Sequence, residues 1–457
     1  MKKFEKSFKV IQYIFIFCLL IFSIQTDSNA MDLAVEIPCS FNPVVSGARS
    51  FGLSGAFIGL SNDATASATN PGGLIQLLYP EGSIVYNQLI RYEDYQLGKY
   101  NTSNDSSVTE KNLNFLSLSF PFEWINRNWV FSVAYQHLYN FDRELLLNAR
   151  HGTFIVHDEH VRYHQKGQLS ALGFSFCAQI TPHFSLGCTL NFWEDFLTDN
   201  GWQQTYNTRD DTIYNDGFND SYTSIILNTK HRYDFNGFNM NVGFLWDFSE
   251  YLNYEPGKIK MGMVLKTPFT ADLTHIIQTH SDNPFKNNLP TSTRITTFEE
   301  MEMPLSLGIG LVYNFSLSWL ATVDLYYTNW QNFLIRNTKY PRREINPISS
   351  KNHAESDISD TIHVRIGTEY ILRRTRPYAV PLRCGLFYDP APAEKNPDDF
   401  FGFSIGTGIT KDGHYSLDIA YQYRMGNDVG QSYLSHLDFK EKIEEHSFMI
   451  STIFYSK

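Results

Sequence analysis

The sequence predicts an all-β protein, a transmembrane antiparallel β-barrel of about 14 strands whose lumen is plugged by an N-terminal hatch. Three observations lead to this expectation. The chain begins with an export signal, segments of alternating apolar and polar residues follow Gly82, and short connections alternate with long polar ones. We therefore divide the chain into a signal peptide at 1–30, a hatch at 31–80 and a barrel at 81–457.

The first thirty residues have the three parts of a secretory signal. Four lysines up to Lys9 supply the basic start, residues 10–24 form the apolar segment, and Ser28 and Ala30 supply small residues before a cleavage site. The apolar segment is shorter than the roughly 20 residues that a spanning helix needs. No second apolar run of that length follows, so any membrane crossing must be made by strands, and the predicted location is the outer membrane.

Charge and motifs exclude several classes of function. The formal net charge is −11, and removal of a basic signal makes the remaining chain more acidic still. This balance argues against nucleic-acid binding, which depends on lysine and arginine. The sequence contains no Gly-x-Ser-x-Gly, His-Glu-x-x-His or phosphate-binding glycine loop. We therefore expect neither an enzyme nor a cofactor.

Cysteines and histidines show no metal spacing that we would rely on. The cysteines are scattered, and we expect them to be mostly free, with a Cys177–Cys188 bridge as the alternative. Four histidines lie close together, at 151, 157, 160 and 164. Imidazoles at this spacing can bind zinc or copper. A polar external loop is the simpler interpretation of the same residues, and it predicts no metal.

Alternation is clearest in two segments of the C-terminal half. In 415–424 and in 319–328, apolar and tyrosine residues share one face and mostly polar residues share the other, as strands require. Asp324 and Asp418 fall on the faces that we assign to the lumen, so they need basic partners. The candidate partners are Arg365, Arg383 and Arg424. The predicted strands lie near 82–97, 111–121, 128–145, 160–179, 183–198, 231–248, 258–277, 301–314, 317–332, 360–371, 381–389, 400–410, 414–424 and 445–456.

The connections alternate in length along the chain. Short turns on one side and long loops on the other are typical of outer-membrane barrels, whereas a β-sandwich has no reason to separate them. The short connections lie near 122–127, 180–182, 249–257, 315–316, 373–380 and 411–413. The long polar ones lie at 98–110, 146–159, 199–230, 278–300, 333–359 and 425–444.

The stretch from Gly47 to Leu74 is rich in small residues and precedes the first strand. Its glycines allow backbone to pack against backbone, which suits a plug inside a larger structure better than a surface linker. The residues that we assign to this hatch are Gly47, Gly52, Gly55, Asp63, Asn70, Pro71 and Gly72.

Four further motifs follow the hatch in a fixed order. They are Met303–Leu311 leading to Asp324–Phe333, then Arg365–Tyr370, Pro381–Pro392 and Phe403–Tyr423. Together with the hatch they resemble the long-chain fatty-acid outer-membrane transporter family of the FadL/TodX type, over most of the chain that follows the signal.

The resemblance implies a function. Hydrophobic compounds, above all long-chain fatty acids or related hydrocarbons, would enter a hatch-blocked barrel from outside and leave sideways through a gap made by a kinked strand. The partners would be such a small molecule and outer-membrane lipid, and we expect a monomer. The alternative is an outer-membrane structural or interaction barrel with a closed lumen, serving as a surface scaffold, adhesin or secretion partner.

Two departures from the family pattern matter. Gly72 stands where the family has alanine, which predicts a looser turn. The third strand, with Val133–Asp142, lacks the glycine that would favour a kink. For ligand contact we single out Trp330, Phe333 and Arg336, with a solvated loop arginine as the alternative for Arg336.

Overall fold

The computed structural model describes nine stretches of the chain. The expected signal peptide and Cys39 lie outside them. The described residues are 45–98, 102–151, 155–215, 220–282, 291–337, 344–349, 351–375, 377–431 and 438–456. Among them, no helix is long and apolar enough to cross a membrane.

The described residues form one antiparallel sheet and a few short helices. The helices are α3 (Ala48–Gly52), α4 (Ala66–Thr69), η1 (Pro71–Gln76), η3 (Glu250–Leu252) and η4 (Trp330–Asn332). The strands are β1 (Glu81–Leu97), β2 (Thr102–Trp124), β3 (Arg127–Asn140), β4 (Arg143–His151), β5 (Ile155–Thr181), β6 (Phe184–Trp193), β7 (Gly201–Asn215), β8 (Asp220–Asp247), β9 (Ile259–Lys266), β10 (Phe269–Asp282), β11 (Thr291–Met303), β12 (Ser306–Ser316), β13 (Trp319–Thr328), β14 (Leu334–Asn337), β15 (Glu344–Ile345), β16 (Thr361–Thr375), β17 (Tyr378–Tyr388), β18 (Phe400–Lys411), β19 (Tyr415–Val429) and β20 (Phe439–Tyr455).

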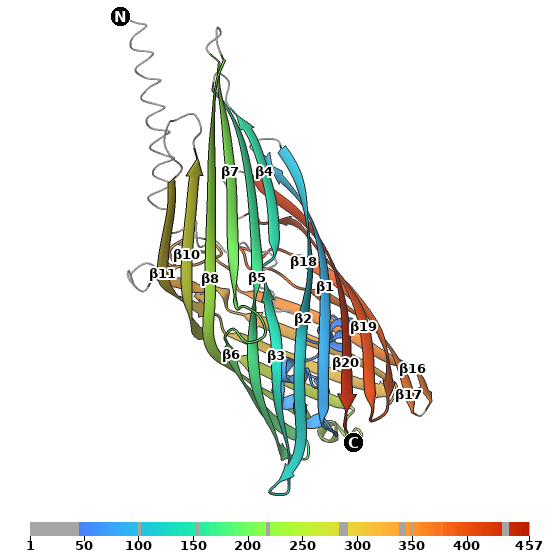
Figure 1. The fold of residues 1–457 in the computed structure, drawn as a ribbon. Coiled ribbons are helices and arrows are strands. Elements are labelled where there is room, and N and C mark those ends of the chain that lie inside the picture. The colour runs from blue at the N-terminus through green and yellow to red at the C-terminus, as the bar shows by residue number, and fades with distance from the viewer. Residues whose placement is uncertain are drawn as a thin grey trace, which may run out of the picture.

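The sheet closes on itself, as the sequence predicts. β1 pairs with β2 on one side and with β20 on the other, from Glu81 opposite Tyr455 to Leu97 opposite Phe439. The result is a closed antiparallel barrel with 14 strands around the wall (Figure 1). The ring runs β1, β2, β3, β5, β6, β8, β9, β12, β13, β16, β17, β18, β19, β20. The predicted number and direction of the strands are confirmed.

Most of the long polar connections prove to be strand rather than loop. The predicted link 199–230 is largely occupied by β7 and by the first part of β8, which pair from Gly201 opposite Asp234 to Asn215 opposite Asp220. β4, β5, β7 and β8 extend far beyond the rest of the wall (Figure 1). Above the wall both faces of a strand can be polar, so these residues lack the one-sided alternation that marked the other strands. We call the end of the barrel to which these four strands extend the long-strand end, and the opposite end the short-turn end.

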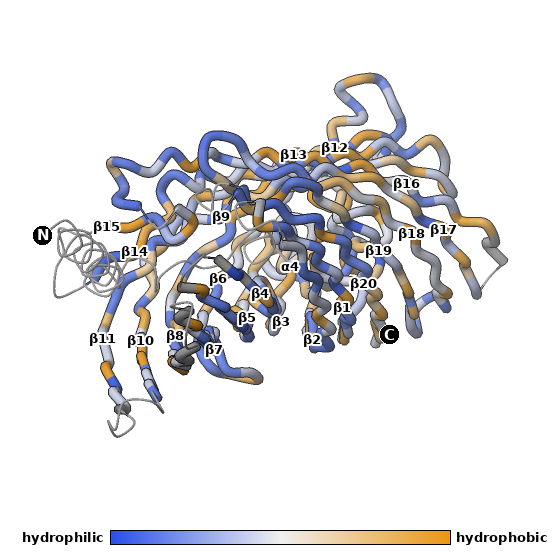
Figure 2. The backbone as a smooth tube through the Cα atoms, turned by 90° about the horizontal axis from the view of Figure 1, so that it is seen from above, coloured by the Kyte–Doolittle hydropathy of each residue, from blue (hydrophilic) through white to orange (hydrophobic). Residues whose placement is uncertain are grey.

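The outer face of the wall is apolar. Ile309, Leu311, Ile366 and Ile419 are exposed there, while their neighbours Asp324, Glu369 and Asp418 face the interior and are buried. Apolar and polar residues alternate along the strands (Figure 2). Aromatic rings gather at the short-turn end, where Phe315 stacks on Trp319 with ring centroids 4.2 Å apart. This distribution is that of a barrel set in lipid.

Candidate functional site: a plugged lumen beneath an apolar chamber

The N-terminal segment lies inside the ring of strands. α4 is seen within the ring from above (Figure 2), α3 contacts β17 to β20, and η1 contacts β5, β6 and β8. Asp324 of β13 fixes the segment by accepting hydrogen bonds from the backbone N–H groups of Phe57 and Ile58 at 2.6 and 2.8 Å. The expected basic partner of Asp324 is therefore replaced, in this contact, by backbone donors of the hatch.

A chain of buried charges ties α3 to the wall. Arg49 donates from Nε and Nη2 to the two oxygens of Glu369, each at 2.9 Å. Arg383 donates from Nε to Glu369 at 2.6 Å and from Nη1 to Asp418 at 2.5 Å. The predicted pairing of Asp418 with a wall arginine is confirmed, and the second arginine on Glu369 comes from the hatch itself.

Asn70 connects the other half of the hatch to the opposite wall. Its Nδ2 donates to the carbonyl oxygens of Ile58 and Phe244, both at 2.9 Å, while its Oδ1 accepts from the Gly72 N–H at 3.0 Å. Pro71 begins η1 directly after Asn70, where its fixed backbone suits a helix start. One side chain thus shapes the turn and holds it against β8.

Gly72 is required by a close approach and does not loosen the turn, contrary to the sequence-based expectation. A Cβ at this position would lie 2.6 Å from Phe244 Cα, closer than two carbon atoms can pack. Gly52 meets Gly406 of β18 in a similar way, with its Cβ position 3.2 Å from the Gly406 Cα. These glycines let the hatch backbone lie directly against the wall.

The remaining hatch residues shape its internal turns. Gly47 and Gly55 have positive φ angles of 89° and 77°, which favour glycine. Asp63 accepts hydrogen bonds from both the N–H and the hydroxyl of Thr65, at 2.9 and 2.6 Å. Burial raises the pKa of the Asp63 carboxyl. Asp63 is thus a turn-forming residue of this segment.

An apolar chamber lies beside the hatch, towards the long-strand end. Its side chains come from β3, β5, β6, β7, β8, β10 and β11, from the residues between β3 and β4, and from the segment that runs from η4 to β16, and they are buried together. The members are Leu138, Phe141, Leu169, Ala171, Trp193, Trp202, Tyr233, Phe235, Ala271, Leu273, Met301, Met303, Trp330, Phe333, Ile335, Ile345, Ile348 and Ile358. We refer to this set as the apolar chamber.

Two of the three sequence-predicted ligand residues belong to the chamber. Trp330 and Phe333 are 2% and 0% exposed, and the Trp330 indole donates to Thr361 Oγ1 at 3.0 Å. Arg336 lies apart from them in an ion pair with Glu302 and donates to Glu344 at 2.8 Å. Any ligand role of these residues stays a prediction.

The wall splits next to the chamber. Pairing between β2 and β3 ends where Phe115 lies opposite Gln136, although β2 continues along β1 to Thr102. β3 stops at Asn140. β4 then lies beside β2 with no backbone ladder to it in the described part of the chain, and the Tyr95 hydroxyl of β1 donates to the Leu146 carbonyl at 2.8 Å. The strand is therefore interrupted between Asn140 and Arg143, although its sequence lacks the glycine that would favour a kink.

The residues that produce this interruption lie mostly on neighbouring strands. Phe141 N–H donates to the Gly167 carbonyl at 3.0 Å, and Asp142 Oδ1 accepts from the Gly167 N–H at 2.8 Å. Gly167 and Gly201, on β5 and β7, have positive φ angles of 146° and 155°. Gly167 of the neighbouring strand therefore bonds to the residues at the interruption, and the sequence of the third strand alone does not indicate this contact.

A second set of buried charges lines the interior near the split, and sequence reasoning missed most of it. Arg91 donates to Glu445 at 2.9 Å, Arg424 donates to Glu445 at 3.1 Å, and Arg365 donates to Asp389 at 2.9 Å. Alternation in β1, β16, β19 and β20 places Arg91, Arg365, Arg424 and Glu445 on the lumen face. Which strands adjoin in space, however, decides their pairing.

Small cavities border the packed hatch. Cavities of about 100 and 70 Å³ border it, lined in part by Val45 and Arg365, and a third of about 30 Å³ lies against the chamber beside Leu138 and Trp193. Each is well below the roughly 300 Å³ at which ligand pockets begin. A ligand that passes through must therefore displace packed side chains.

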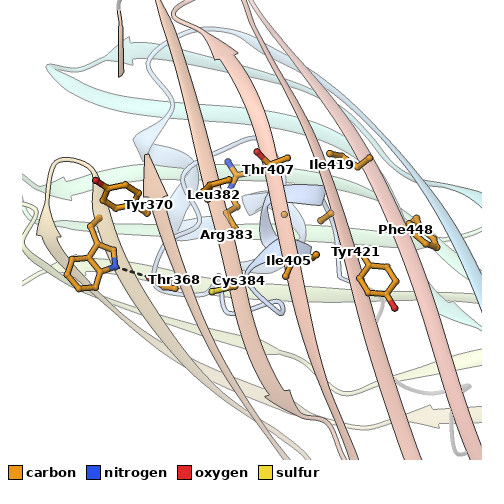
Figure 3. Close-up of a pocket in the computed structure, with 13 residues that line it drawn as sticks. Thr368, Tyr370, Leu382, Arg383, Cys384, Ile405, Thr407, Ile419, Tyr421 and Phe448 are labelled. Carbon is orange, nitrogen blue, oxygen red and sulfur yellow. Dashed lines mark hydrogen bonds between the residues drawn. The ribbon is translucent and has the colours of Figure 1, made fainter. Parts of the chain in front are cut away.

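A larger hollow lies on the outer face of the wall (Figure 3). It measures about 850 Å³ and spans β13 and β16 to β20. Trp319, Tyr370, Tyr421 and Phe448 stand at its edges, and Cys384 lies between them. Figure 3 also shows the Trp319 indole donating to Thr368 Oγ1, at 3.0 Å. The surface is apolar and faces the surroundings of the barrel.

The described cysteines agree with the sequence-based expectation, whereas the histidine run lies on β4 and β5 and not in a loop. Among the described cysteines, Cys177, Cys188 and Cys384 are free, so the alternative Cys177–Cys188 bridge is absent. His157 Nδ1 lies 3.3 Å from Asp210, and His157, Glu159 and Asp210 could together hold a cation. His160 bonds instead to Asn148, at 2.8 Å. The histidine run therefore does not converge on one point.

Comparisons with known proteins agree with this architecture. A family model described as BamG matches residues 57–423, and no curated protein matches the sequence. A FadL homologue from Pseudomonas aeruginosa superposes with a TM-score of 0.61 at 13% identity, covering 91% of this chain and 100% of that one.

Two other solved structures give the same result. The CymD monoaromatic hydrocarbon channel has a TM-score of 0.53 at 15% identity and covers 91% of this chain and 99% of its own. The Pseudomonas putida toluene transporter TodX has a TM-score of 0.53 at 12% identity, with the same coverage of 91% and 99%. The predicted resemblance to FadL/TodX-type barrels is confirmed at the level of the fold.

Proposed function

The chain belongs to the BamG family, and from that premise and its FadL-like fold we propose that it is an outer-membrane channel for passive uptake of hydrophobic compounds. Long-chain fatty acids or related hydrocarbons are the proposed substrates. The observation that carries the proposal is the apolar chamber, which adjoins a split in the wall at Gln136 and lies beside a hatch. The long-strand end would face outwards. In a barrel with an even number of strands both chain termini lie on the same side, here the short-turn end, and the short turns of such barrels face the periplasm.

The physical basis is burial of apolar surface. A greasy molecule entering the chamber would gain about 25 cal/mol for each Å² of apolar surface removed from water. Phe141, Trp330 and Phe333 would supply part of that contact. Release past the hatch must break hydrogen bonds such as those of Asn70, so passage would be coupled to hatch movement.

A disulfide lock tests this coupling. Ser54 of the hatch and Ser404 of β18 have their Oγ atoms 2.8 Å apart, close enough for a cysteine pair to bridge with little backbone shift. In a background with the native cysteines replaced, the Ser54→Cys/Ser404→Cys protein should take up labelled fatty acid into proteoliposomes only after reduction.

The matched control joins two wall strands and leaves the hatch free. Ser119 and Ser132, on β2 and β3, also have Oγ atoms 2.8 Å apart. Ser119→Cys/Ser132→Cys should carry substrate equally well when oxidised and reduced. Uptake by the wild type no faster than by empty liposomes would refute the transport role. Equal uptake by the oxidised and reduced Ser54/Ser404 pair would refute the need for hatch movement.

A second candidate function is supported by a different observation. The outer hollow beside Cys384 is much larger than the interior cavities, and Arg49 and Asp324 hold the hatch in place. A barrel with a permanently closed lumen that docks a membrane partner through this hollow would show these features. Thr407→Trp, which fills the hollow, should then remove a co-purifying partner. Under the uptake proposal, the same change should leave uptake intact.

A further inference from the structure

The floor of the apolar chamber is made of carboxamides, which an apolar route does not require. Asn239 of β8, Asn191 of β6 and Gly173 of β5 lie side by side in the register, and Gln136 of β3 lies against Gly173. Gln136, Asn191 and Asn239 are at most 5% exposed. Asn191 lines the cavity of about 30 Å³ together with Leu138, a chamber residue.

An indole fixes the orientation of these amides. The Trp193 Nε1–H, which can only donate, bonds to Asn239 Oδ1 at 2.9 Å. The same Oδ1 accepts from Asn191 Nδ2 at 3.1 Å. Asn191 Oδ1 is thereby turned away from Asn239, towards the Cβ position of Gly173, which lies 3.2 Å from it.

Three buried polar atoms at this point lack a hydrogen-bond partner among the described residues. They are Asn191 Oδ1 and both Gln136 Oε1 and Nε2. Gln136 Nε2 lies 2.5 Å from the Cβ position of Gly173, so a side chain there would occupy the space that the amide uses. A buried polar atom without a partner is costly, and such groups mark places where a further hydrogen-bonding group fits.

We propose that this amide floor binds a hydroxyl group on an otherwise apolar molecule, so that alcohols and phenols are preferred to hydrocarbons and carboxylates. The inference rests on the proposed uptake of hydrophobic compounds, and within that class it places hydroxylated compounds above the fatty acids and hydrocarbons named there. A hydroxyl can donate to Asn191 Oδ1 or Gln136 Oε1 and accept from Gln136 Nε2. The apolar body would part the side chains of the chamber, beginning at Leu138 and Trp193.

A carboxylate fits less well. It can only accept, so it would meet two amide oxygens that need donors and one amide nitrogen that can serve it. Lys266 also lines the cavity, and its ammonium lies 5.5 Å from the centroid of the Tyr326 ring. A carboxylate would have to bind through Lys266 instead, and the test separates the two cases.

The test compares three ligands that share one apolar body. Toluene, 4-methylphenol and 4-methylbenzoate are titrated calorimetrically into the full chain in lipid nanodiscs, with empty nanodiscs subtracted. We expect 4-methylphenol to bind at least about tenfold more tightly than either of the others, which corresponds to one or two added hydrogen bonds. Gln136→Met should reduce its affinity to that of toluene.

The control variant is Asn87→Leu. Asn87 of β1 is also buried, and its Oδ1 also lacks a partner among the described residues, but it lines a different cavity, whereas Gln136 and Asn191 meet at Gly173. It should leave the preference unchanged. Gly173→Ala is a second variant, which should weaken 4-methylphenol by crowding Gln136, and the heat-modified shift of the folded barrel on gels confirms folding for each variant.

The outcomes are distinct. Equal affinities of the wild type for toluene and 4-methylphenol would overturn the amide site. The amides would then bind only an ordered water, and the proposed uptake function would be unaffected. Tightest binding of 4-methylbenzoate would overturn the hydroxyl preference in favour of Lys266. Failure of all three ligands to bind would contradict the proposed uptake of such compounds itself.

Discussion

Replacing Arg49 with methionine should release the α3 half of the hatch without unfolding the barrel. Arg49 is joined to Glu369 by two hydrogen bonds of 2.9 Å, and their side chains are 20% and 7% exposed. Removing one partner of a buried pair costs about 3–5 kcal/mol. Glu369 keeps Arg383, which donates to it at 2.6 Å. We therefore expect the lower value, about 3 kcal/mol, in the free energy of hatch opening.

Amide hydrogen exchange measures this opening directly. The N–H groups of Leu53 and Gly55 both donate to the Ser50 carbonyl, at 3.0 and 2.8 Å. A loss of about 3 kcal/mol should speed their exchange by roughly 100-fold, at about 1.4 kcal/mol for each factor of ten. Amides of the wall strands should be unaffected, because the change is confined to the hatch.

Arg162→Met is the matched control for this measurement. Arg162 also pairs with a glutamate, Glu144, at 2.6 Å, but its side chain is 62% exposed and lies on the long-strand extension. Surface pairs of this kind contribute at most about 1 kcal/mol, so hatch exchange should not change. An acceleration of less than about threefold in Arg49→Met would show that packing holds the hatch and that the ion pair does not.

Three further predictions follow from the same geometry. Asn70→Ala removes the bond to the Phe244 carbonyl and should impair uptake, measured in proteoliposomes, more than it lowers the barrel's melting temperature. Gly72→Ala should lower that temperature, followed by circular dichroism, through an overpacking cost of about 1–3 kcal/mol against Phe244. Burial raises the pKa of the Asp398 carboxyl, between β17 and β18, to about 6. The folded protein therefore binds a proton at Asp398 more tightly than the unfolded chain does. Protection of the Gly430 amide, which donates to Asp398, should therefore fall as pH rises from about 4 to about 6, and Asp398→Asn should abolish that dependence in exchange measurements.

The sequence predicts the barrel well because strand alternation is a local property. One face of 415–424 must be apolar whichever strands adjoin it, and the partner of Asp418 could be sought among a few lumen arginines. The wall split could not be predicted in this way. It involves Gly167 on β5, which bonds to Phe141 and Asp142 only in the folded barrel, and Gly201 on β7, which lies against Gly167.

The hatch shows the same division between local and long-range information. Its glycines signal close packing, but the wall residue that each one meets cannot be read from the chain. Gly72 was expected to loosen a turn because only the turn was visible, whereas the structure adds Phe244 on the other side. The amide floor was equally hidden, since Gln136, Asn191 and Asn239 come from three strands far apart in sequence.

The two halves of the hatch are held by bonds of different strength, and this sets the order in which they should release. α3 is held by the charged pair of Arg49, whereas η1 is held by neutral hydrogen bonds of Asn70 and by apolar contacts such as that of Leu74. Neutral hydrogen bonds contribute about 0.5–1.5 kcal/mol each and charged ones about 1.5–3. We therefore expect the Leu77 amide, bonded to Leu74 O at 3.0 Å, to exchange before that of Gly55.

This order bears on the route of a substrate. η1 contacts β5, β6 and β8, and two of the amide-floor residues, Asn191 and Asn239, lie on β6 and β8. Release of η1 would begin to connect the chamber to the short-turn end along this side, and the α3 half, where the Ser54/Ser404 lock is placed, would have to follow before a substrate passes. If the Gly55 amide exchanged before that of Leu77, the α3 half would be the first to leave the wall. The route would then have to run along β17 to β20.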